Sequence, residues 1–340
     1  MAKKVLVGLS GGVDSTMSAL MLKEQGYEVE GLYMMLHDKP GYHEIHLARA
    51  QKAADFVGIK LHTLDLQHQF EKKVIQPFVD TYKKGKTPNP CAVCNKNLKF
   101  GEMITFCDKI GADFLATGHY VKCDGEFFYQ AKDDTKDQSY FLFDVPKKIL
   151  PRIIFPLGEW KKEDLKQKAA KIKGLESFAS QEESHDICFV ENSYIEVLDN
   201  FGVVPDMPGE VLDINGNVVG EHKGYMHYTI GKRRGFSVHG AHKPHYVVQL
   251  IPEKNQIVVA TKEHLEIKEV ILENINMFIK DTEFDATVKL RYRTKAVPCH
   301  VKIANNKAYI TLKEGVFGVA SGQAGVLYDD DKLLGGGWIV

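Results

Sequence analysis

The sequence predicts an N-terminal α/β domain built around a parallel sheet, followed by two small β-rich domains. Up to about residue 200, short apolar runs alternate with helical segments, which is typical of βαβ units. After the Gly-Val-Val-Pro stretch at 202–205, short β-branched runs separated by Asn-Gly and Asn-Asn-Lys turns replace this alternation. We therefore expect an α/β domain over 1–200, a central β-rich domain over 201–263 and a C-terminal β-barrel over 264–340.

Composition sets limits on the class of protein. The 340 residues fit two or three domains of roughly 100–200 residues each. The net charge of −1 excludes a global polycation but permits a local basic face. No apolar run approaches the roughly 20 residues that span a bilayer, and the first residues form a strand rather than a signal peptide. Six cysteines are too few for a disulfide framework. We therefore expect a cytoplasmic protein that is not embedded in a membrane. Its cysteines are then free to take part in reactions.

The elements of the α/β domain follow from hydrophobic periodicity. Residues 5–7 form the first strand, and Val13, Met17 and Met21 share one face of the helix after it. The next expected elements are a strand over 29–35, a helix over 44–57, a strand over 60–66, helices over 67–83 and 96–110, and a strand over 114–117. Parallel sheets bind ligands at the carboxyl ends of their strands.

A glycine-rich segment lies between the first strand and the first helix. It consists of Gly8, Leu9, Ser10, Gly11, Gly12, Val13, Asp14 and Ser15. Glycines let the backbone approach a ligand, and consecutive N–H groups at a helix N-terminus bind anions. The segment lacks the Gly-Lys-Ser/Thr end of a Walker A loop. The alternative is a turn capped by Asp14 or Ser15, but a cap does not need the full Ser-Gly-Gly-Val-Asp-Ser string. The string resembles the PP-loop of N-type ATP pyrophosphatases, which cleave ATP to AMP and pyrophosphate to adenylate a carbonyl oxygen.

Three cysteines are candidates for chemistry. Cys91 and Cys94 are expected in a proline-bounded loop just ahead of the helix over 96–110. That position, together with Lys96 and Lys99, predicts a lowered thiol pKa. Cys188 follows His185 in a Ser-His-Asp-Ile-Cys-Phe segment. The spacing leaves three alternatives open, which are a zinc site that includes His185, an iron–sulfur cluster on the three thiolates, and redox chemistry.

The remaining cysteines and a group of histidines are expected to be structural. Cys107, Cys123 and Cys299 occur singly in apolar or hairpin contexts, which favours burial. His37, His43 and His46 have no cysteine or carboxylate placed beside them as a convincing further ligand, so we expect surface or capping histidines rather than a metal site.

Basic residues cluster in two parts of the β-rich region. The first cluster lies between 221 and 245 and contains Lys223, Lys232, Arg233, Arg234 and Lys243, interleaved with Tyr225, Tyr228 and Phe236. The second consists of Lys289, Arg291, Arg293 and Lys295, which would share one face of a strand. Like charges on one strand face repel each other, so the alternatives are a solvated face and an anionic partner. We favour a phosphate backbone as the partner because the clustering is local.

Taken together, these motifs resemble the bacterial tRNA-specific 2-thiouridylases over essentially the whole chain. The matching segments are 8–15, 87–95, 116–120, 136–142, 186–189, 228–233 and 291–293. The resemblance implies ATP-dependent sulfur transfer to the wobble uridine of tRNA. ATP would bind at 8–15 with Mg²⁺ on its phosphates, with Asp14 as a catalytic residue and with Met34 and Gly118 near the adenosine. Adenylation of the uridine C2 oxygen supplies AMP as the leaving group that an amide-like carbonyl lacks.

The resemblance also assigns the thiols and the contacts with RNA. Cys188 would carry a persulfide received from a sulfur-relay or cysteine desulfurase donor. Cys94 would be the second nucleophile, releasing sulfide or closing a Cys94–Cys188 disulfide. The implied contacts with the target base are Asn89, Pro90 and Cys91, and those with the rest of the tRNA are His119, Lys136, Asp137, Gln138, Arg291, Tyr292 and Gln323.

The chain departs from the family pattern at two positions. Many members have Asp where this chain has Cys91, and Gln is common where it has His185. The third thiol keeps an iron–sulfur cluster on Cys91, Cys94 and Cys188 as an alternative. Two other functions also stay open, namely another PP-loop adenylating synthetase and a metal- or cluster-containing tRNA-binding protein without turnover.

Overall fold

The computed structural model describes residues 2–179, 187–240 and 242–340. The chain divides into two compact units. The first comprises Met1–Val74, Cys91–His185 and Asp329–Leu334, and the second comprises Ile75–Pro90, Asp186–Tyr328 and Gly335–Val340. None of the described helices combines the length and the apolar character that crossing a bilayer requires.

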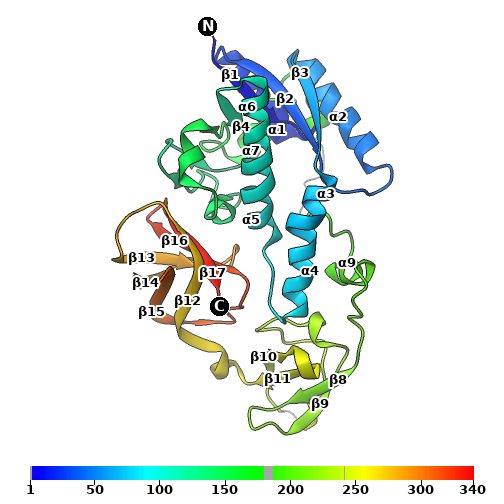
Figure 1. The fold of residues 1–340 in the computed structure, drawn as a ribbon, viewed down its shortest axis with the longest axis vertical. Helices are drawn as coiled ribbons and strands as arrows, with labels where there is room; N and C mark the ends of the chain where they lie inside the picture. The colour runs from blue at the N-terminus through cyan, green and yellow to red at the C-terminus, as the bar shows by residue number, and fades with distance from the viewer. Residues whose placement is uncertain (1, 180–186, 241) are drawn as a thin grey trace. The chain divides into compact units, whose positions relative to one another are not determined.

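The first unit contains a five-stranded parallel sheet in the order β3, β2, β1, β4, β7 (Figure 1). Its strands are β1 (Lys4–Gly8), β2 (Glu28–Met35), β3 (Lys60–Asp65), β4 (Phe114–Ala116) and β7 (Ile153–Ile154). The strand order reverses between β1 and β4, which is where doubly wound sheets bind their ligands. The predicted parallel α/β domain is confirmed.

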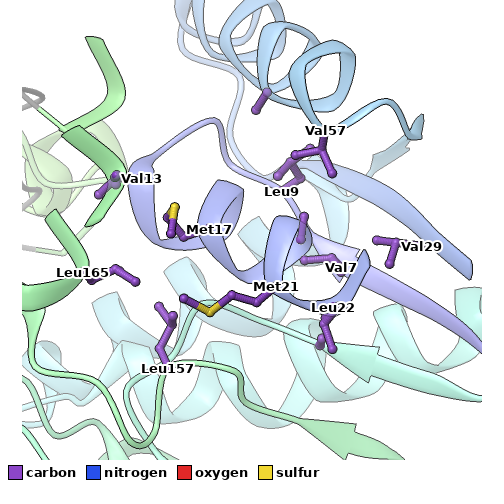
Figure 2. Packing of buried hydrophobic residues seen from close by; sticks show 14 of the residues in the cluster. Val7, Leu9, Val13, Met17, Met21, Leu22, Val29, Val57, Leu157 and Leu165 are labelled. Carbon is purple, nitrogen blue, oxygen red and sulfur yellow. The ribbon is translucent and has the colours of Figure 1, made fainter. Parts of the chain in front are cut away.

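Helix α1 (Val13–Glu24) packs on β1, on α2 (Tyr42–Val57) and on α7 (Lys162–Ala170). Figure 2 shows the core that this packing forms, with Val13, Met17 and Met21 of α1 pointing into it. All three side chains are at most 7% exposed, which confirms the predicted helical face. Burying each side chain of this kind stabilises the fold by about 1.5–3 kcal/mol. The remaining short elements of the unit are β5 (Lys122–Cys123), β6 (Phe128–Tyr129), the 3₁₀ helices Ser139–Leu142 and Lys147–Arg152, and α8 (Glu176–Ala179).

Two long helices each contain a π-helical segment. The first consists of α3 (Gln67–Phe70), the π segment Glu71–Ile75 and α4 (Gln76–Lys83), and the second of α5 (Pro90–Cys94), the π segment Asn95–Glu102 and α6 (Met103–Ile110). The second helix begins at Pro90 rather than at Lys96, because proline fits the first helical turn, where its missing N–H needs no partner. Cys91 and Cys94 therefore lie inside the helix, so the prediction of a loop ahead of it is wrong.

The second unit contains helix α9 (Tyr194–Asn200), a four-stranded sheet and a closed antiparallel barrel. The sheet has the order β10 (Tyr246–Ile251), β11 (Gln256–Ala260), β8 (Gly209–Leu212), β9 (Val218–His222). The barrel has the order β12 (Glu266–Met277), β15 (Lys307–Phe317), β14 (Val297–Ala304), β13 (Glu283–Lys289), β16 (Ala324–Asp329), β17 (Lys332–Ile339). Pairing of β12 with β17 closes it. The 3₁₀ helices here are Tyr225–His227, Pro252–Lys254 and Lys262–Leu265. The predicted β-rich character of this region is confirmed.

The basic segment that follows β13 is a turn, not a strand. Strand β13 ends at Lys289, and the backbone then bends through 290–294 before β14 begins at Val297. The turn is fixed because the backbone N–H and the hydroxyl of Thr294 both donate to the carbonyl oxygen of Arg291, at 3.3 and 2.9 Å. The prediction that Lys289, Arg291, Arg293 and Lys295 share a strand face is therefore wrong.

Candidate active site

The carboxyl ends of β1 and β4 place two loops side by side. The glycine-rich loop follows β1, and residues 117–119 follow β4. A Cβ atom on Gly118 would lie 3.1 Å from the carbonyl carbon of Asp14 and equally close to the nitrogen of Ser15. Glycine at this position therefore allows the two backbones to meet at the strand-order reversal. Met34 lies at the same edge of the sheet, near the end of β2.

Hydrogen bonds within the glycine-rich loop fix its shape. The N–H of Ser10 donates to the hydroxyl of Ser15 at 3.2 Å, and that hydroxyl donates to the carbonyl of Gly12 at 3.1 Å. Gly11 has a φ of +80°, and a Cβ there would lie 2.7 Å from the backbone of Arg49. A side chain is therefore excluded by both conformation and space. The loop leads directly into α1, as an anion-binding loop requires.

A partly buried ion pair joins the loop to helix α7. The Nζ atom of Lys162 lies 2.6 Å from Oδ1 of Asp14, and the hydroxyl of Tyr120 donates to the same oxygen at 2.8 Å. Lys162 is 7% exposed, and its backbone N–H donates to Asp133 at 2.9 Å. Lys162 is not predictable from the sequence, because nothing in the local sequence distinguishes it from its exposed neighbour Lys161.

The histidines after β2 form a packed aromatic group. The hydroxyl of Tyr33 and Nδ1 of His43 are 2.9 Å apart, and Nε2 of His43 contacts the carbonyl oxygen of His37. The ring of Tyr42 stacks on that of His46 at 4.0 Å. His43 is 8% exposed, so the prediction of surface histidines is wrong for this residue. Burial also lowers the pKa of His37 and of His46.

Cys91 and Cys94 lie three residues apart on helix α5, close enough to be neighbours on its surface. Cys94 is buried. Burial raises the pKa of the Cys91 thiol, and the nearby charge of Lys99 opposes this effect without overcoming it. Lys96 instead pairs with the carboxylate of Asp144 at 2.9 Å. The prediction of a lowered pKa is therefore wrong for Cys91, because desolvation of the thiol outweighs the nearby positive charge.

Lys99 also contacts a buried histidine. Its Nζ atom lies 3.4 Å from Nε2 of His119, and Nδ1 of His119 lies 2.6 Å from the hydroxyl oxygen of Thr117. His119 is 7% exposed, and burial together with Lys99 lowers its pKa well below the ordinary value. The ring is therefore neutral at physiological pH. Because an ammonium donates, Nε2 is the acceptor and Nδ1 carries the proton.

Cys188 belongs to the second unit and is exposed. Its neighbours Ile187 and Phe189 pack into an apolar cluster, where the ring of Phe189 lies 5.1 Å from that of Phe78 in an edge-to-face arrangement. The side chains on either side of Cys188 therefore anchor a segment that presents the thiol to solvent. His185, which the zinc alternative requires, lies outside the described residues.

The described residues include no group of three His, Cys, Asp or Glu side chains placed to hold a metal ion. Of the cysteines expected to be structural, Cys107 and Cys299 are buried as predicted, and burial raises the pKa of each to about 12. Cys123 is only partly buried, and burial raises its pKa to about 11.

The segment over 136–138 is tied into the first unit. The carboxylate of Asp137 is 3% exposed and accepts from the N–H of Ala131 at 3.0 Å and the hydroxyl of Ser139 at 2.8 Å. Oε1 of Gln138 accepts from the N–H of Tyr120 at 3.0 Å. Both side chains have internal partners, and Lys136 beside them is half-buried.

Two basic segments of the second unit lie together. A guanidinium nitrogen of Arg291 donates to the carbonyl oxygen of Ile230 at 3.0 Å. The Cα of Gly318 lies 3.4 Å from the position that a Cβ on Gly231 would occupy. The turn at 291–295 therefore meets the segment 230–234, although 61 residues separate Arg291 from Ile230. We call this the basic surface; its exposed cations are Lys232, Arg233, Arg234, Arg293 and Lys295.

Three family models match the chain in succession. They describe a tRNA methyl transferase HUP domain over residues 3–192, a tRNA methyl transferase PRC-barrel domain over 200–261 and an aminomethyltransferase beta-barrel domain over 267–339. Curated relatives named tRNA-specific 2-thiouridylase MnmA match over nearly their full length. The relative from Sulfurimonas denitrificans is 68% identical over 100% of this chain and 99% of its own, and that from Nitratiruptor is 57% identical over 100% of both. A relative from Campylobacter jejuni is 55% identical over 99% of both chains.

The parallel sheet, the phosphate-type loop and the two β-rich regions define a HUP-domain protein of the tRNA-modifying class. The chain belongs to the family of tRNA-specific 2-thiouridylases. Matches to solved structures are more distant. A 4-thiouridine synthetase in complex with RNA and ATP matches at a TM-score of 0.35 and 15% identity, over 55% of this chain and 45% of that chain.

Proposed function

We propose that this protein is an ATP-dependent tRNA 2-thiouridylase that replaces the C2 oxygen of the wobble uridine by sulfur. The observation that carries the proposal is the glycine-rich loop whose Asp14 pairs with the buried Lys162. Relatives that carry the 2-thiouridylase name match over their whole length, which supports the same activity.

The names of the family models refer to methyl transfer, but the residues of the site favour sulfur transfer. Methyl transfer uses a donor that is already activated and requires neither an ATP-cleaving loop nor thiols. An amidating synthetase with the same loop would need neither the cysteines nor the basic surface. The activity therefore depends on the residues of the site rather than on the fold alone.

The first step uses the loop. The uridine C2 oxygen attacks the α-phosphorus of ATP, the bond between the α- and β-phosphates breaks, and pyrophosphate leaves. The N–H groups over 10–15 and the start of α1 hold the pyrophosphate end. Lys162, held by Asp14, donates to phosphate oxygens, and Mg²⁺ bound to the phosphates would offset their remaining charge. Met34 and Gly118 border the adenosine.

The second step uses two thiols. Cys188 receives a persulfide from a sulfur-relay or cysteine desulfurase protein, and its exposure gives such a donor access. The terminal sulfur attacks C2, the C2–O bond breaks, and AMP leaves. The Cys94 thiolate then attacks the Cys188 sulfur, which closes a Cys94–Cys188 disulfide and releases the 2-thiouridine. A reductant must restore the two thiols before the next turnover. Alternatively, Cys94 attacks the persulfide first and releases sulfide as the nucleophile.

The proposed contacts of the substrate RNA come from residues of each unit. Asn89, Pro90 and Cys91 are the proposed contacts of the target base, and the cations of the basic surface are the proposed contacts of the phosphate backbone. His119, Lys136, Asp137, Gln138, Arg291 and Tyr292 complete the set of tRNA contacts that we propose, whereas the amide of Gln323 donates to the carbonyl oxygens of Thr87 and Pro88. We further propose that the domains divide at 1–200, 201–263 and 264–340 and that the protein acts in the cytoplasm, where thiols stay reduced.

The test is reconstitution with unmodified tRNA, ATP, Mg²⁺ and a persulfide donor, followed by nucleoside digestion. We expect 2-thiouridine, together with AMP and pyrophosphate that form only when tRNA is present. The matched control is the Asp14→Ala variant, which should bind tRNA but make none of these three products. ADP and phosphate as the products, or methylated uridine in the digest, would refute the proposal.

A further inference from the structure

The loop that precedes the cysteine helix is bound to the connection between two barrel strands. The N–H of Thr87 donates to the carbonyl oxygen of Ser321 at 2.8 Å. The side-chain Nε2 of Gln323 donates to the carbonyl oxygens of Thr87 and Pro88, at 3.2 and 2.8 Å. Three hydrogen bonds therefore join two segments that are more than 230 residues apart in sequence.

The barrel side of this contact is itself fixed in place. The N–H of Gly322 donates to the carbonyl of Ile339 at 2.9 Å, and the N–H of Ile339 donates to the carbonyl of Gln323 at 2.8 Å. Gly322 has a φ of +87°, and a Cβ there would lie 2.9 Å from the carbonyl oxygen of Thr87. The backbone of 321–323 therefore touches the loop directly, and strand β17 holds it there.

These contacts limit what Gln323 can do with RNA. A glutamine amide has two N–H donors, and here both point at carbonyl oxygens of the loop. Because carbonyl oxygens only accept, the orientation of the amide is fixed. Oε1 stays available as an acceptor, so Gln323 has no donor left for a phosphate oxygen.

We propose that Gln323 is a positioning residue that holds Thr87 and Pro88, and with them the base-contacting residues Asn89 and Pro90. The loop continues without a break into helix α5, which carries Cys91 and Cys94. The barrel thereby sets the geometry of the nucleobase loop in addition to binding tRNA. This inference rests on the proposed function, since it assigns a task within that reaction.

The experiment compares the wild type with Gln323→Met, which keeps the length of the side chain and removes both donors. In the tRNA-free protein, we expect amide hydrogen exchange at Thr87, Asn89 and Cys91 to quicken about tenfold or more. At saturating tRNA, kcat for thiolation should fall about tenfold to a hundredfold, because small misplacements of reacting groups are costly. KM for tRNA should change less than threefold.

Two further variants make the result decisive. Gly322→Ala places a methyl group against the Thr87 carbonyl and leaves Gln323 intact. It should therefore reproduce both the faster exchange and the lower kcat. It replaces Gln323→Met in the experiment if that variant does not fold. Gln256→Met is the matched control in the same unit, since the amide of Gln256 donates to Glu210 at 2.7 Å on β11, and it should change neither readout.

The inference would be overturned if amide hydrogen exchange in tRNA-free Gln323→Met were unchanged and the loss of activity came entirely from weaker tRNA binding. Gln323 would then be an RNA contact. The exchange measurement needs neither tRNA nor ATP. If the wild type makes no 2-thiouridine, the proposed function fails, and the exchange comparison still decides whether Gln323 holds the loop.

Discussion

The ammonium of Lys162 contacts both carboxylate oxygens of Asp14, although the two residues are 148 positions apart in the chain. Their side chains are 9% and 32% exposed, respectively. The carboxylate of Asp14 offsets the cost of removing the ammonium from water. Because Lys162 is also the proposed phosphate ligand, the pair links the stability of the loop to its proposed binding of phosphate.

Replacing Lys162 by Met should abolish pyrophosphate release, because the phosphates lose a cation at the loop. We expect a fall in kcat of at least about a hundredfold, with tRNA affinity nearly unchanged. The measurement is tRNA-dependent pyrophosphate release alongside a tRNA binding curve. Lys161→Met is the control because Lys161 is exposed and precedes Lys162 directly. Equal loss in both variants would remove Lys162 from the ATP site.

Replacing Asp14 by Ala should also destabilise the fold, because it leaves a buried ammonium without its carboxylate. We expect a loss of about 1–3 kcal/mol, below the range for a fully buried pair because Asp14 is partly exposed. The double variant Asp14→Ala/Lys162→Met should recover part of that loss. Strictly additive losses in urea denaturation would contradict the coupling.

Replacing Arg293 by Ala should weaken binding of every tRNA alike. Arg293 is exposed in the turn after β13, and losing one phosphate contact reduces the slope of log K against log salt by about one. Binding curves at several salt concentrations measure this slope. Lys302→Ala is the control, since Lys302 is exposed on β14 and faces Glu283 at 3.8 Å. An unchanged slope for Arg293→Ala would show that Arg293 is solvated and does not contact a phosphate.

Substitution of each cysteine should distinguish the roles of the three thiols. Cys94→Ser and Cys188→Ser should each abolish thiolation, because serine forms neither a persulfide nor a disulfide. Cys91→Ser and Cys91→Asp should keep a large share of activity in air, since the proposed mechanism requires only the thiols of Cys94 and Cys188. Thiolation by metal-free protein with a persulfide donor is the measurement.

The same assay tests the iron–sulfur alternative. No product from the metal-free wild type, followed by turnover once iron and sulfide are added, would overturn the two-thiol mechanism. In that case Cys91→Ser should lose iron and activity together, as expected of a cluster ligand.

His119 should make folding sensitive to acid. Its folded pKa is depressed, so below about pH 6.5 the unfolded chain binds a proton that the folded protein does not. Stability from this group is present above that pH and is lost as pH falls, by up to about 1.4 kcal/mol per pH unit. Thermal midpoints between pH 5 and 8 should therefore rise less steeply with pH in His119→Gln than in the wild type.

His300 gives the opposite sign and serves as the control. Hydrogen bonds to Asp285 and Glu283 raise its pKa, so its contribution is present at low pH and is lost as pH rises. His300→Gln should lower the midpoint at pH 5 and leave it unchanged at pH 8. Parallel profiles for wild type and His119→Gln would show that the buried ring does not control acid sensitivity.

Contiguous features were predictable from the sequence, and long-range ones were not. The glycine-rich loop and the apolar face of α1 depend on residues close in sequence, so periodicity and composition indicated both. Lys162 reaches Asp14 only through the packing of α7 on α1, which no local pattern encodes.

Two errors have local physical causes. Alternation of charge at 289–295 fits a strand as well as a turn, and the bonds from Thr294 to Arg291 decide in favour of the turn. The cysteine helix was predicted to begin at Lys96 because Pro90 was interpreted as part of a loop. Proline fits the first turn of a helix as well as it fits a loop. Because Pro90 begins the helix, Cys91 lies within it.

The π segment Asn95–Glu102 makes the cysteine helix tolerant of changes in its length. Its backbone hydrogen bonds join residues five positions apart instead of four, so each of its turns contains more residues than an α-helical turn. Removing one residue would let the segment tighten toward an α-helix without unfolding. Side chains within the segment would then change direction about the helix axis relative to the two thiols, because an α-helix turns by about 100° per residue and a π-helix by less. The charge that Lys99 exerts on Cys91 therefore depends on the number of residues between them as well as on their identity.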